Sequence, residues 1–248
     1  MKSTLNNFLF VLIFLFPFNL GAQYYKAANY TKNGENLPYR FLLPENYSHN
    51  QKYPLLIFLH GAGERGDDNE LQLFHGSNLF LDKKFREKHP AIIVFPQCPK
   101  GSYWATIIDR PEPLKFQYSK SPKNNPILSL VEGIIDDFIE KYKVDKQRIY
   151  IGGLSMGGMG TFEMVYRNPR TFAAAFAICG GANPKISKRI RHTSWRIDHG
   201  DRDNVVPIIH SELMYKAMKE EKIDVIFKIH KGVNHNSWDN VFSDSDFI

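Results

Sequence analysis

Short, continuous apolar runs alternate with amphipathic segments along most of the chain. Such runs are typical of strands buried on both faces of a parallel sheet, and the segments between them have the spacing of crossover helices. The pattern therefore predicts an α/β fold with a mainly parallel central sheet and helices on both faces. Strands are expected at residues 39–43, 55–59, 91–95, 149–151, 173–178, 194–199 and 225–229.

Two segments between these runs have the pattern of amphipathic helices. In residues 127–142 apolar side chains recur at intervals of three and four, and Pro126 stands just ahead of them, as at a helix start. A second helix is expected over roughly residues 208–221. No internal repeat, low-complexity tract or linker to a second domain is visible, so residues 23–248 are expected to form one domain.

The first 22 residues differ from the rest of the chain. Lys2 supplies a positive charge, residues 8–18 form an apolar run of eleven residues, and a Gly-Ala pair precedes Gln23. An apolar run of this length is too short to cross a bilayer but fits an export signal. We therefore expect residues 1–22 to be a signal peptide and the mature protein to be secreted or periplasmic. No cysteine follows the run, which argues against a lipid anchor.

Composition and charge narrow the class of protein. Cys98 and Cys179 are too few for a disulfide framework, and because they follow different expected strands we expect both to be unpaired and buried. One disulfide between them is the alternative in an oxidising compartment. The net charge of +6 comes from lysines scattered among acidic residues, which is typical of a solvated surface rather than a nucleic-acid-binding face. No H-E-x-x-H or comparable cluster indicates a metal site.

The sequence around Ser155 has the pattern of a nucleophile elbow. A short β-rich run at residues 149–151 leads into GLSMG at 153–157, and a helix-compatible segment follows. In such a G-x-S-x-G turn the serine is strained at the tip, and glycines without a Cβ let the strand and the helix approach closely. The alternative is a glycine-rich turn with an incidental serine.

A serine nucleophile needs a histidine base and an acid that orients it. In this architecture they follow in the order Ser, acid, His, each just past a later strand. Asp203 follows one expected strand and precedes Val-Val-Pro, and His235 follows the next strand. These two residues are the expected partners of the serine. Asp201 and Asp198 are the competitors for the acid, but Asp203 lies further into its loop and Asp198 falls within the strand.

The other histidines are less well placed for catalysis. His60, His199 and His230 lie at the ends of expected strands, where structural hydrogen bonding is the better interpretation. The remaining five fall in loops or on helix surfaces. His235 is therefore the preferred base.

The segment HGAGERG at 60–66 follows a buried strand and is suited to binding an oxyanion. Its glycines allow backbone N–H groups to point into the site. We expect the N–H groups of Ala62 and Met156 to be the two donors. Glu64 and Arg65 are expected to pin this loop through an ion pair and hydrogen bonds, with direct substrate contact as the alternative.

Residues 100–125 form a long polar and aromatic connection. Its length favours a wall or partial cap of an acyl or sugar pocket, and the alternative is a surface elaboration with its own small core. Trp104 and Trp238 are candidate stacking surfaces for substrate. Trp238 lies three residues beyond His235, although a packing role suits so large a ring equally well.

Together, five motifs resemble the α/β-hydrolase superfamily: HGAGERG at 60–66, PQCP at 96–99, GLSMGG at 153–158, HGDRDNVVP at 199–207 and GVNHNSWD at 232–239. Within it the chain is similar, over roughly residues 37–242, to secreted bacterial carboxylesterases related to feruloyl esterases, polyhydroxybutyrate depolymerases and peptidases. The resemblance implies a Ser155-Asp203-His235 triad and an acyl-enzyme mechanism without a cofactor. Superfamily members usually have a closing helix after the histidine loop. Only thirteen residues follow His235, so we expect that helix to be very short or the chain to be truncated.

These features predict a serine carboxylic-ester hydrolase. Its expected substrates are small-molecule or polysaccharide esters, such as acetyl or feruloyl groups on sugars. A serine peptidase of the same fold is the alternative, although no propeller or other gating domain is evident. A non-catalytic binding protein is more remote because such a protein would be expected to have lost a triad residue. No nucleic acid, metal or membrane anchor is expected for the mature chain.

Overall fold

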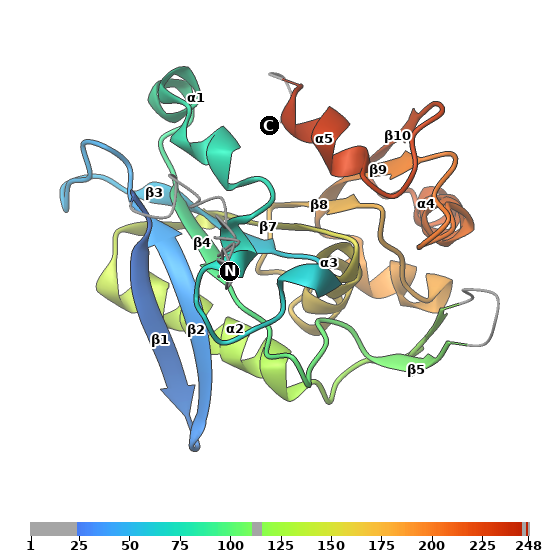
Figure 1. The fold of residues 1–248 in the computed structure, drawn as a ribbon, viewed down its shortest axis with the longest axis horizontal. Coiled ribbons are helices and arrows are strands. Elements are labelled where there is room, and N and C mark those ends of the chain that lie inside the picture. Colours follow the sequence, from blue (N-terminus) through green and yellow to red (C-terminus); the bar gives the residue numbers. More distant parts are fainter. Residues whose placement is uncertain (1–23, 111–115, 245–246, 248) are drawn as a thin grey trace, which may run out of the picture.

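The computed structural model describes residues 24–110, 116–244 and 247 (Figure 1). The expected signal peptide therefore lies outside the described residues. The main sheet contains β1 (Lys26–Lys32), β2 (Glu35–Leu42), β3 (Tyr53–Leu59), β4 (Ile92–Pro96), β7 (Val144–Leu154), β8 (Ala174–Ile178), β9 (Ser194–Gly200) and β10 (Val225–His230). Two short strands, β5 (Ile107–Asp109) and β6 (Gln117–Tyr118), form a separate antiparallel pair.

The order of the main sheet is β1-β2-β4-β3-β7-β8-β9-β10. β2 pairs antiparallel with both β1 and β4, and all other neighbouring pairs are parallel. The mainly parallel sheet predicted from the apolar runs is confirmed. The carboxyl ends of β3, β7, β8, β9 and β10 consequently lie along one edge of the sheet, where ligand sites form in α/β folds.

The helices are α1 (Lys83–Lys88), α2 (Pro126–Lys141), α3 (Met156–Arg167), α4 (Ile209–Glu220) and α5 (Ser237–Phe242). The shorter 3₁₀ turns are η2 (Ala62–Glu64), η3 (Leu71–Leu73), η4 (Ser77–Leu81) and η5 (Pro184–Ile190). The closing helix expected after the histidine loop is thus α5, which has six residues.

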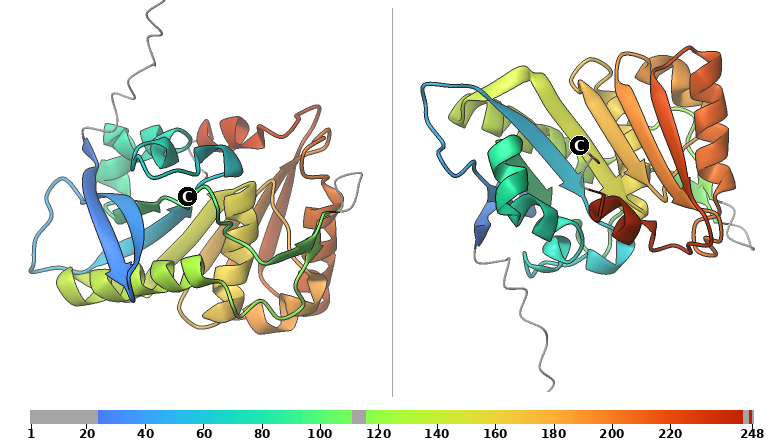
Figure 2. Two further views of the ribbon diagram at one scale, coloured as in Figure 1. Left: turned by 60° about the horizontal axis from the view of Figure 1, so that its bottom comes forward. Right: turned by 90° about the horizontal axis from the view of Figure 1, so that it is seen from above.

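Alternating side chains of the strands divide the core into two layers. Leu55 and Ile57 of β3 pack with α2, α3 and α4 on one face. Leu56 and Phe58 point to the other face, where α1, η4 and α5 contribute (Figure 2). β3 and β4 are buried at nearly every position and are apolar throughout, which is why they appear as continuous runs in the sequence.

The first strand, β1, was not predicted from the sequence. Its residues are mostly exposed and polar, and it lies at the edge of the sheet. The turn that joins it to β2 has Asn33 and Gly34 at positive φ values of 54° and 82°. An Asn-Gly pair in this conformation is a strong hairpin signal, so turn chemistry rather than apolar periodicity could have revealed this strand.

Helix α2 confirms the helix predicted over residues 127–142. Asn125 caps it by accepting from the backbone N–H of Leu128, and Pro126 occupies its first position. On its buried face, Phe138 makes edge contacts with Tyr39 and Phe41, with ring centroids 5.9 and 5.4 Å apart. This aromatic cluster attaches the helix to β2.

We expect Phe138→Ala to lower the free energy of unfolding by about 3–5 kcal/mol, because it removes a buried ring that its neighbours cannot replace. The urea midpoint of the purified protein measures this change. Glu140→Ala, at an exposed position on the same helix, is the control and should stay within about 0.5 kcal/mol of the parent. Equal losses in both variants would contradict the packing described here.

Candidate active site

The strand-turn-helix predicted around Ser155 is present. β7 ends at Leu154 and α3 begins at Met156, and Ser155 between them has φ 52° and ψ −118°. A positive φ is costly for a residue with a side chain and persists only where the surrounding structure enforces it. A Cβ on Gly157 would lie 1.9 Å from the carbonyl oxygen of Leu59, so only glycine lets α3 pack on the end of β3.

The three residues predicted as a triad meet at the carboxyl edge of the sheet. The Ser155 hydroxyl oxygen lies 2.9 Å from Nε2 of His235, and Nδ1 of His235 lies 2.7 Å from Oδ2 of Asp203. Because a carboxylate only accepts, Nδ1 carries the proton and Nε2 accepts from the serine hydroxyl. This is the arrangement in which a histidine can take the proton of a serine nucleophile.

Asp203 is held by four hydrogen-bond donors. The backbone N–H groups of Val205 and Val206 each donate to Oδ1 at 2.9 Å. His235 and His199 approach Oδ2 at 2.7 and 3.2 Å. Burial by itself would raise the pKa of Asp203, but the hydrogen bonds from the two histidines hold it well below its usual range. Asp203 is therefore ionised throughout the neutral pH range.

The two competing acids have other partners. Asp201 accepts a 2.6 Å hydrogen bond from the backbone N–H of Gly232. Asp198 is buried between Arg196 and His230, with its oxygens 2.7 Å from the Arg196 Nε and 2.8 Å from the His230 Nε2. The structure thus brings Asp203 to the histidine, as the loop position suggested.

The segments that carry the two expected oxyanion donors lie side by side. Ala62 begins η2, and Met156 is the first residue of α3, whose first N–H groups have no acceptor within the helix. A Cβ on Gly61 would lie 3.7 Å from the Cβ of Ser155, so the turn containing Ala62 adjoins the serine. Both backbone segments are therefore close enough to the serine to serve an oxyanion.

His60 fixes the peptide that contains the Ala62 N–H. The backbone N–H of Cys98 donates to His60 Nε2 at 2.9 Å, so the ring proton lies on Nδ1, which donates to the carbonyl oxygen of Gly61 at 2.6 Å. That carbonyl belongs to the same planar peptide unit as the Ala62 N–H. Burial lowers the pKa of His60 to about 4, so the ring stays neutral.

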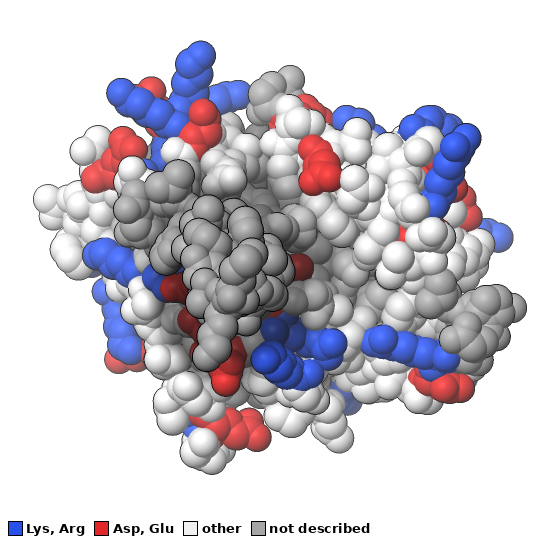
Figure 3. All heavy atoms as spheres, viewed as in Figure 1, with Lys and Arg blue, Asp and Glu red and all other residues white. Residues whose placement is uncertain are grey.

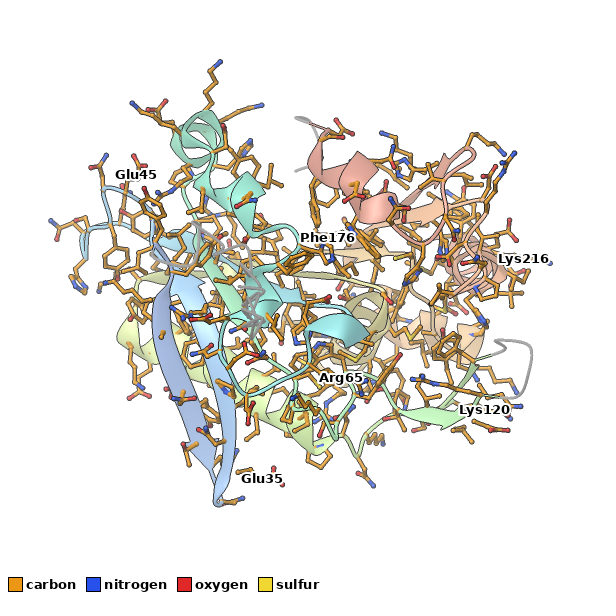
Figure 4. All side chains as sticks on the ribbon, in the orientation of Figure 1. Glu35, Glu45, Arg65, Lys120, Phe176 and Lys216 are labelled. Atoms are coloured by element: carbon orange, nitrogen blue, oxygen red, sulfur yellow. The ribbon has the colours of Figure 1, made fainter. Side chains whose placement is uncertain are left out.

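Arg65 holds the next peptide of the turn, as the sequence predicted. Its Nε donates to the carbonyl oxygen of Ala62 at 2.9 Å, and its Nη1 donates to the carbonyls of Lys100 and Ser102 (Arg65 is labelled in Figure 4). Arg65 therefore ties the oxyanion turn to the long connection.

The ion pair expected between Glu64 and Arg65 does not form among the described residues. Glu64 instead lies 4.0 Å from Nδ1 of His60 and 3.9 Å from Nε2 of His75. Burial raises the pKa of Glu64. The carboxyl group turns toward the histidines because Arg65 already donates to three backbone carbonyls.

The prediction that Trp104 is a stacking surface is wrong. Its side chain is 0% exposed and packs edge-on against His60 at 5.4 Å between ring centroids. A Cβ on Gly160 would lie 2.5 Å from the Trp104 Cβ, so this glycine of α3 makes room for the tryptophan in the core. A fully buried ring has no face to offer a substrate.

Trp238, the other predicted stacking residue, lies next to the base. Its ring is partly exposed and stands edge-on to His235, with centroids 5.3 Å apart. Two rings that the sequence analysis missed continue from it. His75 lies 4.9 Å from Trp238, and Phe74, which is 58% exposed, lies 4.7 Å from His75. We call Phe74, His75 and Trp238 the aromatic row.

The signal for the aromatic row in the sequence is weak. A Phe-His pair precedes Gly76 in a segment without apolar periodicity, and an exposed aromatic in such a loop is a candidate contact. Its position relative to His235 depends on the contact of α5 with the turn at His75 and Gly76, which sequence patterns do not report.

The long connection, residues 100–125, packs beside the site. Its Ala105 and Tyr118 form a small apolar cluster with Met159 and Val206. Met159 lies on the first turn of α3, and Val206 donates to the triad acid. The connection therefore stands against the elements that carry Ser155 and Asp203, and its residues 111–115 lie outside the described part of the chain.

Both cysteines are unpaired and buried, as expected. Cys179, at the end of β8, lies within 4.8 Å of the reactive atoms of Asp203 and His235. Burial raises its pKa strongly, so it is a neutral thiol and a poor metal ligand there. Asp203 and His235 instead hydrogen-bond to each other.

The charges on the face shown in Figure 3 are mixed. Lysine and arginine side chains lie in the same areas as aspartate and glutamate side chains. This distribution fits the solvated surface predicted from the sequence. Within the described ranges, each helix is too short or too polar to span a lipid bilayer.

Comparison with known proteins places the chain among ester hydrolases. The sequence model of the phospholipase/carboxylesterase family matches residues 46–247. A mouse lysophospholipase-like protein 1 is 28% identical over 201 residues, covering 73% of this chain and 79% of that protein. A bifunctional acetylxylan esterase/xylanase of Neocallimastix patriciarum is 30% identical over 180 residues, covering 72% of this chain but only 23% of that enzyme.

Solved structures give the same picture of the fold. A thermostable esterase superposes with a TM-score of 0.80 at 32% identity, covering 92% of this chain and 62% of that one. A ferulic acid esterase from Anaeromyces mucronatus, solved with ferulic acid, has a TM-score of 0.63 at 18% identity, covering 85% and 84% of the two chains. The latter similarity concerns the α/β-hydrolase fold alone.

The neutral, buried state of His60 predicts a specific pH dependence of stability. Between about pH 6.5, the ordinary pKa of histidine, and pH 4 the unfolded chain binds a proton at His60 that the folded chain rejects. Stability is therefore lost as pH falls through this window, by up to about 3 kcal/mol from this residue. Urea unfolding at a series of pH values measures the slope.

The matched variant is His60→Asn. Between pH 4 and 6.5, its free energy of unfolding should change with pH less steeply than that of the parent, by the equivalent of about one bound proton. His49→Asn, at an exposed histidine, is the control and should keep the slope of the parent. An unchanged slope in His60→Asn would show that His60 is not a buried neutral imidazole.

Proposed function

Because this chain belongs to the phospholipase/carboxylesterase family of α/β-hydrolases, we propose that it is an exported serine esterase that removes acyl groups from polysaccharides. Membership establishes a carboxylesterase-type hydrolase. One observation supports the catalytic roles above all: two hydrogen bonds link Ser155 to His235 and His235 to Asp203.

The first half of the proposed reaction forms an acyl-enzyme. His235 Nε2 takes the hydroxyl proton as Ser155 Oγ attacks the ester carbonyl carbon. The tetrahedral oxyanion accepts hydrogen bonds from the backbone N–H groups of Ala62 and Met156. The ester C–O bond then breaks, and His235 gives its proton to the leaving alcohol.

The second half releases the acid. His235 takes a proton from water, whose oxygen attacks the acyl carbon, and then returns the proton to Ser155 Oγ. Throughout, Asp203 keeps the proton of His235 on Nδ1 and stabilises the imidazolium. His60 and Arg65 keep the oxyanion turn in place, so little reorganisation is needed when charge develops.

The aromatic row supports a sugar ester as substrate. Trp238 contacts His235, the group that protonates the leaving alcohol, and the row leads away from it to the exposed Phe74. Flat, partly exposed rings are suitable platforms for sugar rings or aromatic acids. The acetylxylan esterase among the relatives and the feruloyl esterase-like fold are consistent with such substrates.

Export is part of the same proposal. Residues 1–22 have the charge and apolar pattern of a signal peptide, and polysaccharide substrates of this kind are met outside the cytoplasm. The rest of the chain would then act as one secreted or periplasmic catalytic domain.

We expect Ser155→Ala to reduce kcat on p-nitrophenyl acetate by about 10⁶, since the nucleophile is lost while the fold remains. A matched panel of p-nitrophenyl acetate, p-nitrophenyl octanoate, methyl ferulate and a chromogenic peptide should show turnover of esters and not of the peptide. Ester hydrolysis that survives the substitution would refute the proposed nucleophile, and preferred cleavage of the peptide would refute the esterase assignment.

The aromatic row predicts a selective effect on binding. Phe74→Ala should raise KM for a feruloylated oligosaccharide by roughly 3–10-fold, the loss of one ring contact, with kcat unchanged. The smaller substrate methyl ferulate should be unaffected because it has no sugar ring to contact Phe74. Ile226→Ala, at a similarly exposed apolar residue on β10, is the control. The same KM shift on both substrates would argue against a sugar platform.

A further inference from the structure

We propose that His199 is a positioning residue for the triad acid: it donates to Asp203 from inside the protein and holds a fixed positive charge there. This inference rests on the proposed catalytic role of Asp203. The sequence analysis treated His199 as a structural histidine at a strand end, and the mechanism above does not use it.

The hydrogen bonds of His199 place a proton on Nε2. The side chain, on β9, is fully buried. Its Nε2 lies 2.8 Å from the carbonyl oxygen of Val206 and 3.2 Å from Oδ2 of Asp203, the same oxygen that accepts from His235. Both neighbours are acceptors, so Nε2 must donate.

The other ring nitrogen also faces an acceptor. Nδ1 of His199 lies 2.7 Å from Oγ of Ser211 on α4. The Ser211 hydroxyl donates its only proton to the carbonyl oxygen of Gly180 at 2.9 Å, so toward the ring it can only accept. A histidine that donates from both nitrogens is an imidazolium.

The surrounding charges are consistent with this state. The Asp203 side chain is fully buried, and a buried carboxylate needs a compensating partner. His235 must be neutral to act as the base, which leaves His199 as the balancing cation. Cys179, within 4.8 Å of the Asp203 and His235 groups, is a neutral thiol.

The charged residue next to His199 on β9 does not take part in balancing the charge of Asp203. Asp198, the residue before His199, points to the other face of β9, since successive side chains of a strand alternate. There it is paired with Arg196 and His230. The ion pair of Asp203 and His199 is therefore separate from that network.

The consequence concerns the base. A carboxylate next to a histidine favours the protonated form of that histidine. The charge on His199 offsets part of this effect at His235. Loss of the charge should shift the acidic limb of the pH profile upward.

The test compares His199→Gln with His199→Asn. Glutamine keeps an N–H donor near the position of Nε2 without the charge, whereas asparagine is too short to reach Asp203. In both variants we expect the acidic limb of kcat/KM on p-nitrophenyl acetate to move up by about one pH unit. At alkaline pH, kcat should be higher in His199→Gln than in His199→Asn because the donor is retained.

Two further variants make the result specific. Ser211→Ala removes only the acceptor of the Nδ1 proton and should shift the acidic limb in the same direction. His230→Asn changes another buried histidine, paired with a different carboxylate, and should lower stability without moving the limb. If His199→Gln, His199→Asn and Ser211→Ala all leave the limb where it is in the parent, the charge on His199 is refuted.

A spectroscopic measurement does not depend on activity. In Ser155→Ala protein with nitrogen-labelled histidines, the imidazole nitrogen shifts of His199 should show both nitrogens protonated at neutral pH. A neutral tautomer would overturn the inference even where the triad is correct. Ester hydrolysis that survives in Ser155→Ala would instead refute the proposed function, so the two failures are distinguishable.

Discussion

The contact between the end of β3 and the start of α3 is the constraint on which the site depends. A Cβ on Gly157 would lie 1.9 Å from the Leu59 carbonyl oxygen, and one on Gly153 would lie 2.5 Å from the same atom. With no side chains between them, two backbone segments touch. This contact holds Ser155 at a positive φ and sets the oxyanion turn beside it. Nucleophile and oxyanion donors are therefore aligned by backbone packing, which is stiffer than side-chain contacts.

The base and the acid depend on a second set of constraints at the same edge of the sheet. Their loops follow β9 and β10, which pair in parallel, so both loops begin at the same edge of the sheet. Asp203 is then fixed by two backbone N–H groups and two imidazoles. These hydrogen bonds hold the carboxylate in place, and a fixed acid keeps the histidine in one tautomer.

The sequence predicted the central strands, α2 and the triad because each has a local signature. Apolar runs reflect burial on both faces, and the order Ser, acid, His reflects the chain order of parallel strands. It missed β1, whose polar residues lie at an edge, and it placed the Trp104 ring at the surface. It also paired Glu64 with Arg65. In each case a tertiary contact decides the outcome. β1 forms because it pairs with β2, and Trp104 is buried because it packs against Gly160 and His60. Arg65 donates to backbone carbonyls and not to Glu64.

What the sequence by itself determined is the chemistry that could be present: a serine in a glycine-flanked turn, and an acid and a histidine after later strands. Periodicity and turn residues are local properties, so they can be seen without coordinates. Only the tertiary structure decided which acid meets His235, that His199 joins Asp203 from inside, and that Phe74 and Trp238 share one row. These are distances between segments far apart in the chain, and they arise when the sheet and its helices pack.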